Sequence, residues 1–152
     1  MLNYGAAGIG AGAHLATELF KSMTDLDIVR AVYKGTAPSL TALMAGEVDL
    51  MFGSTPASMP HVKAGRLRIL GITSARPSAL VPGVPTIASA GVPGYEFVST
   101  DGIHVPAGTP ATIILRLNQE IVRFLNTPAT KEFFSTLGWR LPRPHRASPQ
   151  PL

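Results

Sequence analysis

The residues best suited to binding chemistry lie in a glycine-rich turn near the start of the sequence. Gly8, Gly10, Ala11 and Gly12 follow a short apolar segment and lead directly into an amphipathic helical pattern. Glycine permits positive φ and lets the backbone approach a guest closely. The first N–H groups of a helix lack internal partners and carry partial positive charge. The turn therefore predicts a pocket for a carboxylate or phosphate, and a tight turn without a ligand is the alternative.

Two further turns repeat this combination of small residues and a following helix. Gly35 and Thr36 come after one apolar segment, and Gly53, Ser54 and Thr55 come after the next. The hydroxyl groups of Ser54 and Thr55 can donate to a ligand carboxylate or cap the helix, and the two roles are compatible. All three turns are candidate ligand-binding segments, although the first lacks the lysine and Ser/Thr of a P-loop.

The titratable residues give little support for catalysis. His14 has no carboxylate or nucleophile at triad-like spacing, so packing or helix capping explains it more simply than general-base chemistry. Asp49 lies in an apolar strand pattern, where a structural carboxylate is the simpler interpretation. The sequence has no cysteine, no paired carboxylates, no nucleophile elbow and no two histidines at metal-ligand spacing. It predicts no catalytic residue, metal or cofactor, and a small enzyme using His14 or Asp49 is the third-ranked alternative.

Composition indicates a folded α/β protein and argues against nucleic acid as a partner. The 152 residues are 45% hydrophobic but only 14% charged, so some apolar surface is expected to face a second domain or a partner. The pI of about 9.9 comes mostly from Arg140, Arg143 and Arg146. Without these three, the 13 basic residues fall to 10, against 9 acidic ones. No apolar run reaches the roughly 18 residues of a membrane span, and no signal-peptide pattern is present.

Strand and helix patterns alternate through the first half of the chain. Apolar runs predict strands at 2–5, 27–32, 48–53 and 67–72, and helical spacing predicts helices at 12–23, 38–46 and 54–65. This alternation is typical of βαβ units, so the predicted fold class is α/β, with a four-stranded, mainly parallel sheet and flanking helices. Because ligands bind at the carboxyl ends of parallel strands, the three small-residue turns are expected along one edge of the sheet.

The rest of the chain has a different character. The stretch 77–93 contains four prolines and predicts an ordered connection with little helix. Strands are expected at 95–98 and 102–105, followed by helices at 110–126 and 128–137. The first of these helices has an apolar stripe formed by Ile113, Ile114, Leu117, Ile121 and Leu125. The segment 139–152 has four prolines and no periodicity, and is expected to be disordered.

Several short motifs occur in a fixed order along the chain. They are Asn3-Tyr4-Gly5 with Gly8-x-Gly10 and His14-Leu15-Ala16, Val32-Tyr33-Lys34-Gly35-Thr36, Ala45-Gly46-Glu47-Val48-Asp49, Val84-Pro85-Thr86, and Val105-Pro106-Ala107-Gly108-Thr109-Pro110. This series resembles the Bug-type periplasmic solute-binding receptors of tripartite tricarboxylate transporters. The resemblance covers roughly residues 2–138.

The resemblance implies a domain organisation. Residues 1–98 would form the nearly complete second, ligand-binding domain of a type II periplasmic-binding-protein clamshell. Residues 99–138 would be the return crossover and helical piece of an otherwise missing first domain, so the chain would be the truncated C-terminal portion of a receptor. Two residues depart from the family pattern near the turns: Ala11 stands where a serine is usual, and Val32 where a proline is usual.

The resemblance also implies a function. The chain would be an extracytoplasmic solute-binding protein fragment that captures a small organic anion such as a carboxylate. Backbone N–H groups at Gly10–Gly12, Gly35–Thr36 and Gly53–Thr55 would hold the anion, with millimolar affinity, and membrane transporter components would receive it. The implied location is periplasmic, although the chain as it stands, without a signal peptide, would stay cytoplasmic. The alternative is a non-binding fold remnant that self-associates through exposed apolar surface.

Overall fold

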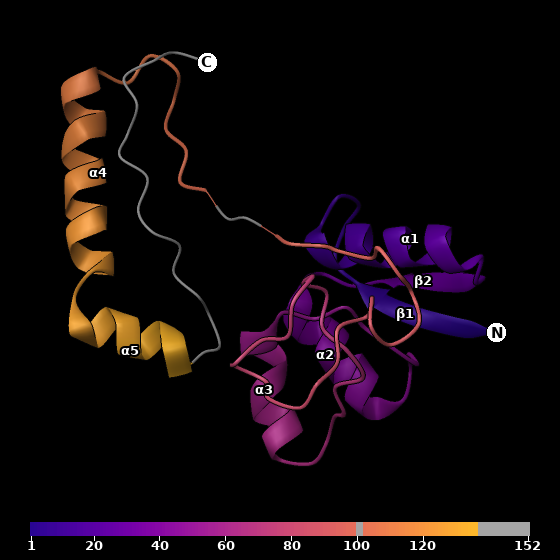
Figure 1. Cartoon of the computed structure of the whole chain (residues 1–152). Helices are drawn as coiled ribbons and strands as arrows, with labels where there is room; N and C mark the ends of the chain where they lie inside the picture. Colours follow the sequence, from indigo (N-terminus) through magenta and orange to yellow (C-terminus); the bar gives the residue numbers. More distant parts are fainter. Residues whose placement is uncertain (100–101, 137–152) are drawn as a thin grey trace. The chain divides into compact units, whose positions relative to one another are not determined.

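The computed structural model describes residues 1–99 and 102–136. The chain divides into two compact units, Met1–Ser99 and Thr100–Leu152 (Figure 1). The expected disorder of 139–152 falls outside the described residues, and the assignment of 1–98 and 99–138 to two receptor domains stays a prediction. No helix within the described ranges is long and apolar enough to cross a membrane.

The first unit is built on a small parallel sheet, which confirms the predicted α/β class. β1 (Leu2–Ala6) and β2 (Ile28–Val32) pair in parallel over their full length, with Ala6 opposite Val32. Tyr4, Ala6 and Ile28 are no more than 1% exposed and form the centre of the core. On the other side of β1, a parallel bridge joins Tyr4 to Leu50, and the Gly5 N–H donates to the Leu50 carbonyl at 3.0 Å.

The sheet has fewer strands than predicted. Among the described residues, the segment 48–53 pairs with β1 only through the single bridge, and 67–72 does not join the sheet. Ile72 instead bridges Thr86, donating its N–H to the Pro85 carbonyl at 3.0 Å. Proline has no N–H to continue a ladder, so pairing in this proline-rich region does not extend into a strand. The strands expected at 95–98 and 102–105 are likewise absent.

Three helices in the first unit each follow one of the predicted turns. α1 (Gly12–Thr24) agrees with the prediction to within one residue, while α2 (Thr36–Ala45) begins two residues earlier than expected. α3 (Thr55–Lys63) follows the third turn. Gly46 ends α2 in the left-handed conformation with φ 74°, where glycine has no steric penalty.

Close packing joins α2 and α1 to the rest of the first unit. Ser39 of α2 is fully buried and lies so near Gly5 that a Cβ at Gly5 would overlap its Oγ. Phe20 of α1 forms an aromatic cluster with Phe52 and Tyr95, with ring centroids 5.7–6.3 Å apart. The Tyr95 hydroxyl also donates to the Ala16 carbonyl at 2.9 Å, which fixes the proline-rich connection to α1.

The second unit contains α4 (Ala111–Leu125) and α5 (Pro128–Thr136), close to the predicted helices. No residue of α4 is buried, although its sequence is strongly amphipathic. The Thr130 N–H donates to the Thr127 hydroxyl at 3.3 Å, which supports the predicted start of α5 after Thr127. In the apolar stripe of α4, Ile113, Ile114 and Leu117 are exposed, whereas Ile121 and Leu125 are half-buried.

Candidate functional site

The three predicted turns lie along the carboxyl edge of the sheet. Ala6 and Val32, the last residues of β1 and β2, are paired, and the Tyr33 N–H donates to the Ala6 carbonyl at 2.9 Å. The segment that contains Leu50 runs parallel to β1, on the side of β1 that faces away from β2. Since parallel segments end at the same edge, the turns that lead into α1, α2 and α3 are brought to one side of the first unit (Figure 1).

Two N–H groups of the glycine-rich turn already form hydrogen bonds with neighbouring residues. Gly10 has φ 83°, a left-handed conformation that glycine adopts without strain. The Ala11 N–H donates to the Gly8 carbonyl at 3.2 Å, and the Gly10 N–H donates to His14 Nδ1 at 3.3 Å. In the structure a turn bond occupies the Ala11 N–H and the imidazole occupies the Gly10 N–H, and the binding of an anion by Gly10–Gly12 stays a prediction. His14 caps the turn, in line with its simpler interpretation.

The start of α1 keeps unpaired donors. Ala11 is the N-cap, with φ −63° and ψ 150°, and it makes no side-chain cap hydrogen bond. Among the described residues, the N–H groups of Gly12 and Ala13 have no hydrogen-bond partner. An N-cap serine or aspartate would ordinarily accept from the N–H of the second or third helical residue, here Ala13 or His14. Because Ala11 has no side-chain acceptor, N–H groups in the first turn of α1 remain without a side-chain cap.

The other two helices also start without a side-chain cap. Gly35 precedes α2 with φ 112°, and Thr36 is exposed at its first position. Ser54 precedes α3 and makes no side-chain cap hydrogen bond, so its predicted capping role is not seen among the described residues. Gly53 packs against Ser58, whose Oγ would lie only 2.7 Å from a Cβ at Gly53. Among the turn residues, Gly10, Thr36, Gly53 and Ser54 are exposed, whereas Gly12, Gly35 and Thr55 are half-buried.

Acidic residues are kept away from this edge. The first turns of α1, α2 and α3 contain no acidic residue. Asp49 lies at the opposite, amino end of the sheet, where its Oδ2 accepts from the Asn3 N–H and its own N–H donates to Asn3 Oδ1, both at 2.8 Å. This reciprocal pairing gives Asp49 a structural role. The first turns of these three helices consequently have no side-chain carboxylate of their own to offset the helix dipole.

A hydrogen-bonded group beneath α1 holds the helix on the sheet. The buried Tyr4 hydroxyl donates to Glu18 Oε1 at 2.7 Å, and Lys21 pairs with the same oxygen at 3.3 Å. The hydrogen bond from Tyr4 holds the pKa of Glu18 below its ordinary value, and burial raises the pKa of Tyr4. Burial also raises the pKa of Tyr95 to about 12. These groups support α1 rather than face the carboxyl edge.

Phe97 and Ser99 were missed by sequence reasoning. A Cβ at Gly12 would lie 3.7 Å from Ser99 Oγ and 3.8 Å from Phe97 Cε1, so both side chains border the start of α1. Phe97 is held there by its N–H, which donates to the Thr73 carbonyl at 2.8 Å. No local motif marks this contact, since the residues are far apart in the sequence.

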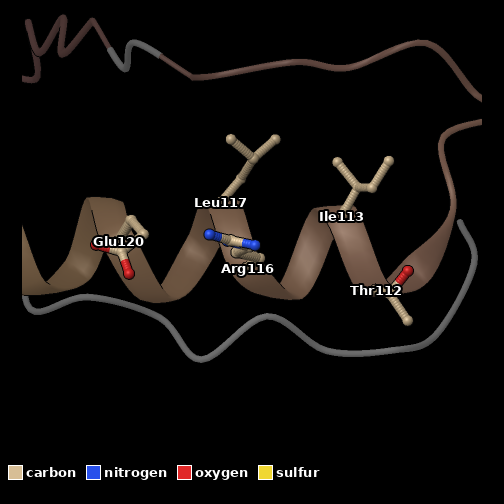
Figure 2. Close-up of a pocket in the computed structure, with 5 residues that line it drawn as sticks. All are labelled: Thr112, Ile113, Arg116, Leu117 and Glu120. Atoms are coloured by element: carbon tan, nitrogen blue, oxygen red, sulfur yellow. The ribbon is translucent and has the colours of Figure 1, made fainter.

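Other features do not add to the site. No group of three or more metal-ligating side chains occurs among the described residues. A hollow of about 340 Å³ lies on α4, in the second unit, and is lined by Thr112, Ile113, Arg116, Leu117 and Glu120 (Figure 2). None of these residues belongs to the predicted ligand-binding set.

Comparison with known proteins gives one consistent family. A family model described as the tripartite tricarboxylate transporter family receptor matches residues 1–145. The protein BugT of Bordetella pertussis is 38% identical over 132 residues, which are 86% of this chain and 40% of BugT.

Solved structures agree with this match. The structure of R. palustris Rpa4515 with adipate has a TM-score of 0.85 and 41% identity, covering 90% of this chain and 46% of that one. MatC (Rpa3494) from Rhodopseudomonas palustris with bound malate has a TM-score of 0.84 and 29% identity, covering 94% of this chain and 49% of that one. The chain therefore spans less than half the length of each of these three relatives.

Proposed function

The chain belongs to the tripartite tricarboxylate transporter receptor family, a family of solute-binding receptors, and from this premise we propose that it binds a small organic anion at the carboxyl edge of its sheet. The observation that carries the proposal is the set of three helix N-termini along that edge, all without side-chain caps and without acidic residues in their first turns. We name this set, residues 8–12, 35–36 and 53–55, the anion edge.

The anion edge suits a carboxylate because its donors are backbone N–H groups with fixed directions. A hydrogen bond from such a donor to a charged acceptor contributes about 1.5–3 kcal/mol, and the helix dipoles add favourable charge interaction near the first turn. Gly12 and Thr36 supply N–H groups at the starts of α1 and α2, and Ser54 and Thr55 add hydroxyls. Binding requires no covalent step, and we expect no turnover.

Dicarboxylates are the preferred ligand class in this proposal. Relatives of this chain have been solved with adipate and with malate, and both ligands carry two carboxylates. One carboxylate would occupy the anion edge, close to Phe97 and Ser99, which border the start of α1. Ala11 provides no hydroxyl, so the contact at that position is made by the backbone alone.

The expected affinity follows from the small number of donors. Three charged hydrogen bonds contribute roughly 5–9 kcal/mol, and association costs at least about 4 kcal/mol. A dissociation constant of about 1 mM corresponds to roughly −4 kcal/mol. We therefore expect millimolar binding by the 152-residue chain, with further contacts from the rest of a clamshell where one is present.

The biological setting is part of the proposal. The family model describes a transporter family receptor, and one similar solved structure is the periplasmic binding protein BugD. We propose that this chain represents the ligand-binding domain of such a receptor and acts in the same compartment.

A calorimetric titration with a matched pair of variants tests the proposal. Gly12→Pro removes one N–H at the first helical position, where proline is tolerated, and Ala11 already has the extended conformation that proline requires of its predecessor. Gly12→Ala keeps the N–H and adds a Cβ at ordinary contact distance. Adipate should bind the wild type and Gly12→Ala alike, and bind Gly12→Pro about tenfold more weakly, since one charged hydrogen bond of about 1.5 kcal/mol is lost.

A neutral diol with the same carbon chain serves as the ligand control. It should not bind measurably, because the anion edge recognises charge. Equal binding of adipate and the diol, or equal effects of Gly12→Pro and Gly12→Ala, would contradict the proposal.

A further inference from the structure

A titratable side chain takes part in the glycine-rich turn of the anion edge. The Gly10 N–H donates to His14 Nδ1 at 3.3 Å, so the half-buried imidazole occupies one of the backbone donors of that edge. A ring nitrogen accepts a hydrogen bond only while it carries no proton. The contact therefore requires the neutral form of His14, with the ring proton on Nε2.

Protonation of His14 changes the turn in two ways that both favour an anion. The imidazolium has an N–H at each ring nitrogen and no acceptor, so it must release the exposed Gly10 N–H. It also places a positive charge in the first turn of α1, beside the unpaired N–H groups of Gly12 and Ala13. A positive charge near a helix N-terminus is unfavourable unless an anion lies there. A bound proton and a bound anion therefore stabilise each other.

Other charged and titratable groups lie on the elements that pack around α1. They are Glu18 and Lys21 on α1, Tyr4 on β1, Arg30 on β2, Tyr33 and Lys34 in the second turn, and Tyr95 and Glu96 in the segment that borders α1. Tyrosine, lysine, arginine and carboxylate side chains ordinarily keep their charge between about pH 6.5 and 8.5.

The structure moves three of these groups further from that range. The hydrogen bond from Tyr4 lowers the pKa of Glu18, and burial raises the pKa of Tyr4 and of Tyr95. The α-amino group of Met1 ordinarily titrates within the range, but it precedes β1 and lies at the amino end of the sheet, opposite the anion edge. Within residues 1–99, His14 is therefore the group of the anion edge that changes its charge near neutral pH.

We propose that His14 couples anion binding at the anion edge to the uptake of a proton, because its neutral ring blocks the Gly10 N–H and its protonated ring releases it. The inference rests on the proposed function for the site itself and adds the side chain that regulates it. A carboxylate ligand then binds more tightly as pH falls through the range in which histidine ordinarily titrates. The expected gain between about pH 8.5 and 6.5 is about fivefold in affinity, which corresponds to one neutral hydrogen bond.

The contact is tested first without a ligand, by amide NMR of the whole chain. The Gly10 amide should shift between pH 8.5 and 6.5, and His14→Ala should abolish that shift. His61→Ala is the matched control, because His61 is also half-buried in the first unit but lies in the last turn of α3. It should leave the Gly10 shift as in the wild type. A Gly10 amide that does not respond to pH, or that responds equally in His14→Ala, would overturn the inference whether or not an anion binds.

Calorimetric titration with adipate at the same two pH values tests the coupling. Both values lie above the range in which carboxylic acids ordinarily titrate, so the ligand keeps its charge. The wild type and His61→Ala should bind about fivefold more tightly at pH 6.5, with proton uptake that is seen as a dependence of the heat on the buffer. His14→Ala should bind equally at both values, because no ring blocks the Gly10 N–H. Circular dichroism reports whether each variant keeps its fold.

The outcomes separate the inference from the proposed function. Adipate binding by the wild type that is the same at both pH values would overturn the coupling and leave the anion edge in place. PH dependence that persists in His14→Ala would assign the proton to another group and would likewise overturn the coupling. Absence of binding by all three chains at both pH values would contradict the proposed function itself.

Discussion

Replacement of Gly5 by alanine is the sharpest test of how the sheet positions the helix starts. Gly5 lies in β1 beneath α2, and a Cβ there would overlap Ser39 Oγ and lie 3.3 Å from Val48 Cγ2. Ser39 is fully buried, so the hydroxyl cannot swing into solvent. Overpacking of this kind costs about 1–3 kcal/mol, and we expect Gly5→Ala to lower the free energy of unfolding by about 2 kcal/mol.

Gly8→Ala is the matched control for this substitution. No atom lies within 4 Å of a Cβ at Gly8, and its φ is not in the left-handed region. Alanine at position 8 should leave the free energy of unfolding unchanged or raise it by up to about 1 kcal/mol, because alanine lowers the conformational entropy of the unfolded chain. The difference between the two variants isolates the steric cost at Gly5, measured by urea unfolding followed by circular dichroism, with the same m-value expected in both.

A second substitution locates the clash. Ser39→Ala removes the overlapping oxygen. The Cβ of residue 39 would then lie 3.6 Å from the Cβ added at residue 5, which is an ordinary contact distance. On its own it loses a 3.4 Å hydrogen bond to Met51 Sδ and should cost about 0.5 kcal/mol. Combined with Gly5→Ala it should recover about 1 kcal/mol or more as a coupling energy. If Gly5→Ala matches Gly8→Ala, or if Ser39→Ala gives no recovery, the inferred packing of α2 on β1 is refuted.

Three further substitutions should change stability in defined ways. Tyr95→Phe loses the hydrogen bond to the Ala16 carbonyl and should cost about 1 kcal/mol in urea unfolding. It should also reduce the loss of stability expected as pH rises from 10 towards 12, because burial raises the pKa of Tyr95 to about 12 and the unfolded chain ionises first. The part of the loss that comes from Tyr4, whose pKa burial also raises, should remain. Tyr4→Phe should reduce the loss of stability at acid pH. The hydrogen bond from Tyr4 lowers the pKa of Glu18, so the ionised Glu18 stabilises the fold above pH 4.5, and this stabilisation is lost as pH falls through the lower folded pKa. Asp25→Gly should raise the thermal midpoint, with a gain of about 0.5–1 kcal/mol, because Asp25 ends α1 at φ 53°, where glycine is unstrained.

Local patterns in the sequence predict the helices well. α1, α4 and α5 have strong helical spacing, and their observed bounds agree with the prediction to within a residue or two. The start of α2 was placed two residues late because Pro38 resembles a first-turn residue, whereas the helix begins directly after the left-handed Gly35. Helix ends depend on such local conformations, which short motifs indicate only in part.

Strand pairing and the ligand-facing donors depend on non-local contacts. The apolar run at 67–72 is compatible with a sheet strand, but Ile72 pairs with the proline-rich connection instead. The glycine turn predicts backbone donors for an anion, but composition cannot indicate that the His14 imidazole accepts from the Gly10 N–H. Phe97 and Ser99 reach the start of α1 only through the folded path of the chain.

The most direct test of the anion edge is an amide NMR titration of the chain with adipate. The account predicts saturable shifts of the Gly12, Thr36 and Thr55 amides with millimolar affinity, and no shift of the Gly108 amide, which belongs to the other unit. The Gly10 amide should shift as well if the anion displaces His14 Nδ1 from it. If the Gly12, Thr36 and Thr55 amides stay unchanged at tens of millimolar adipate, the anion edge does not bind carboxylates and the central claim is contradicted.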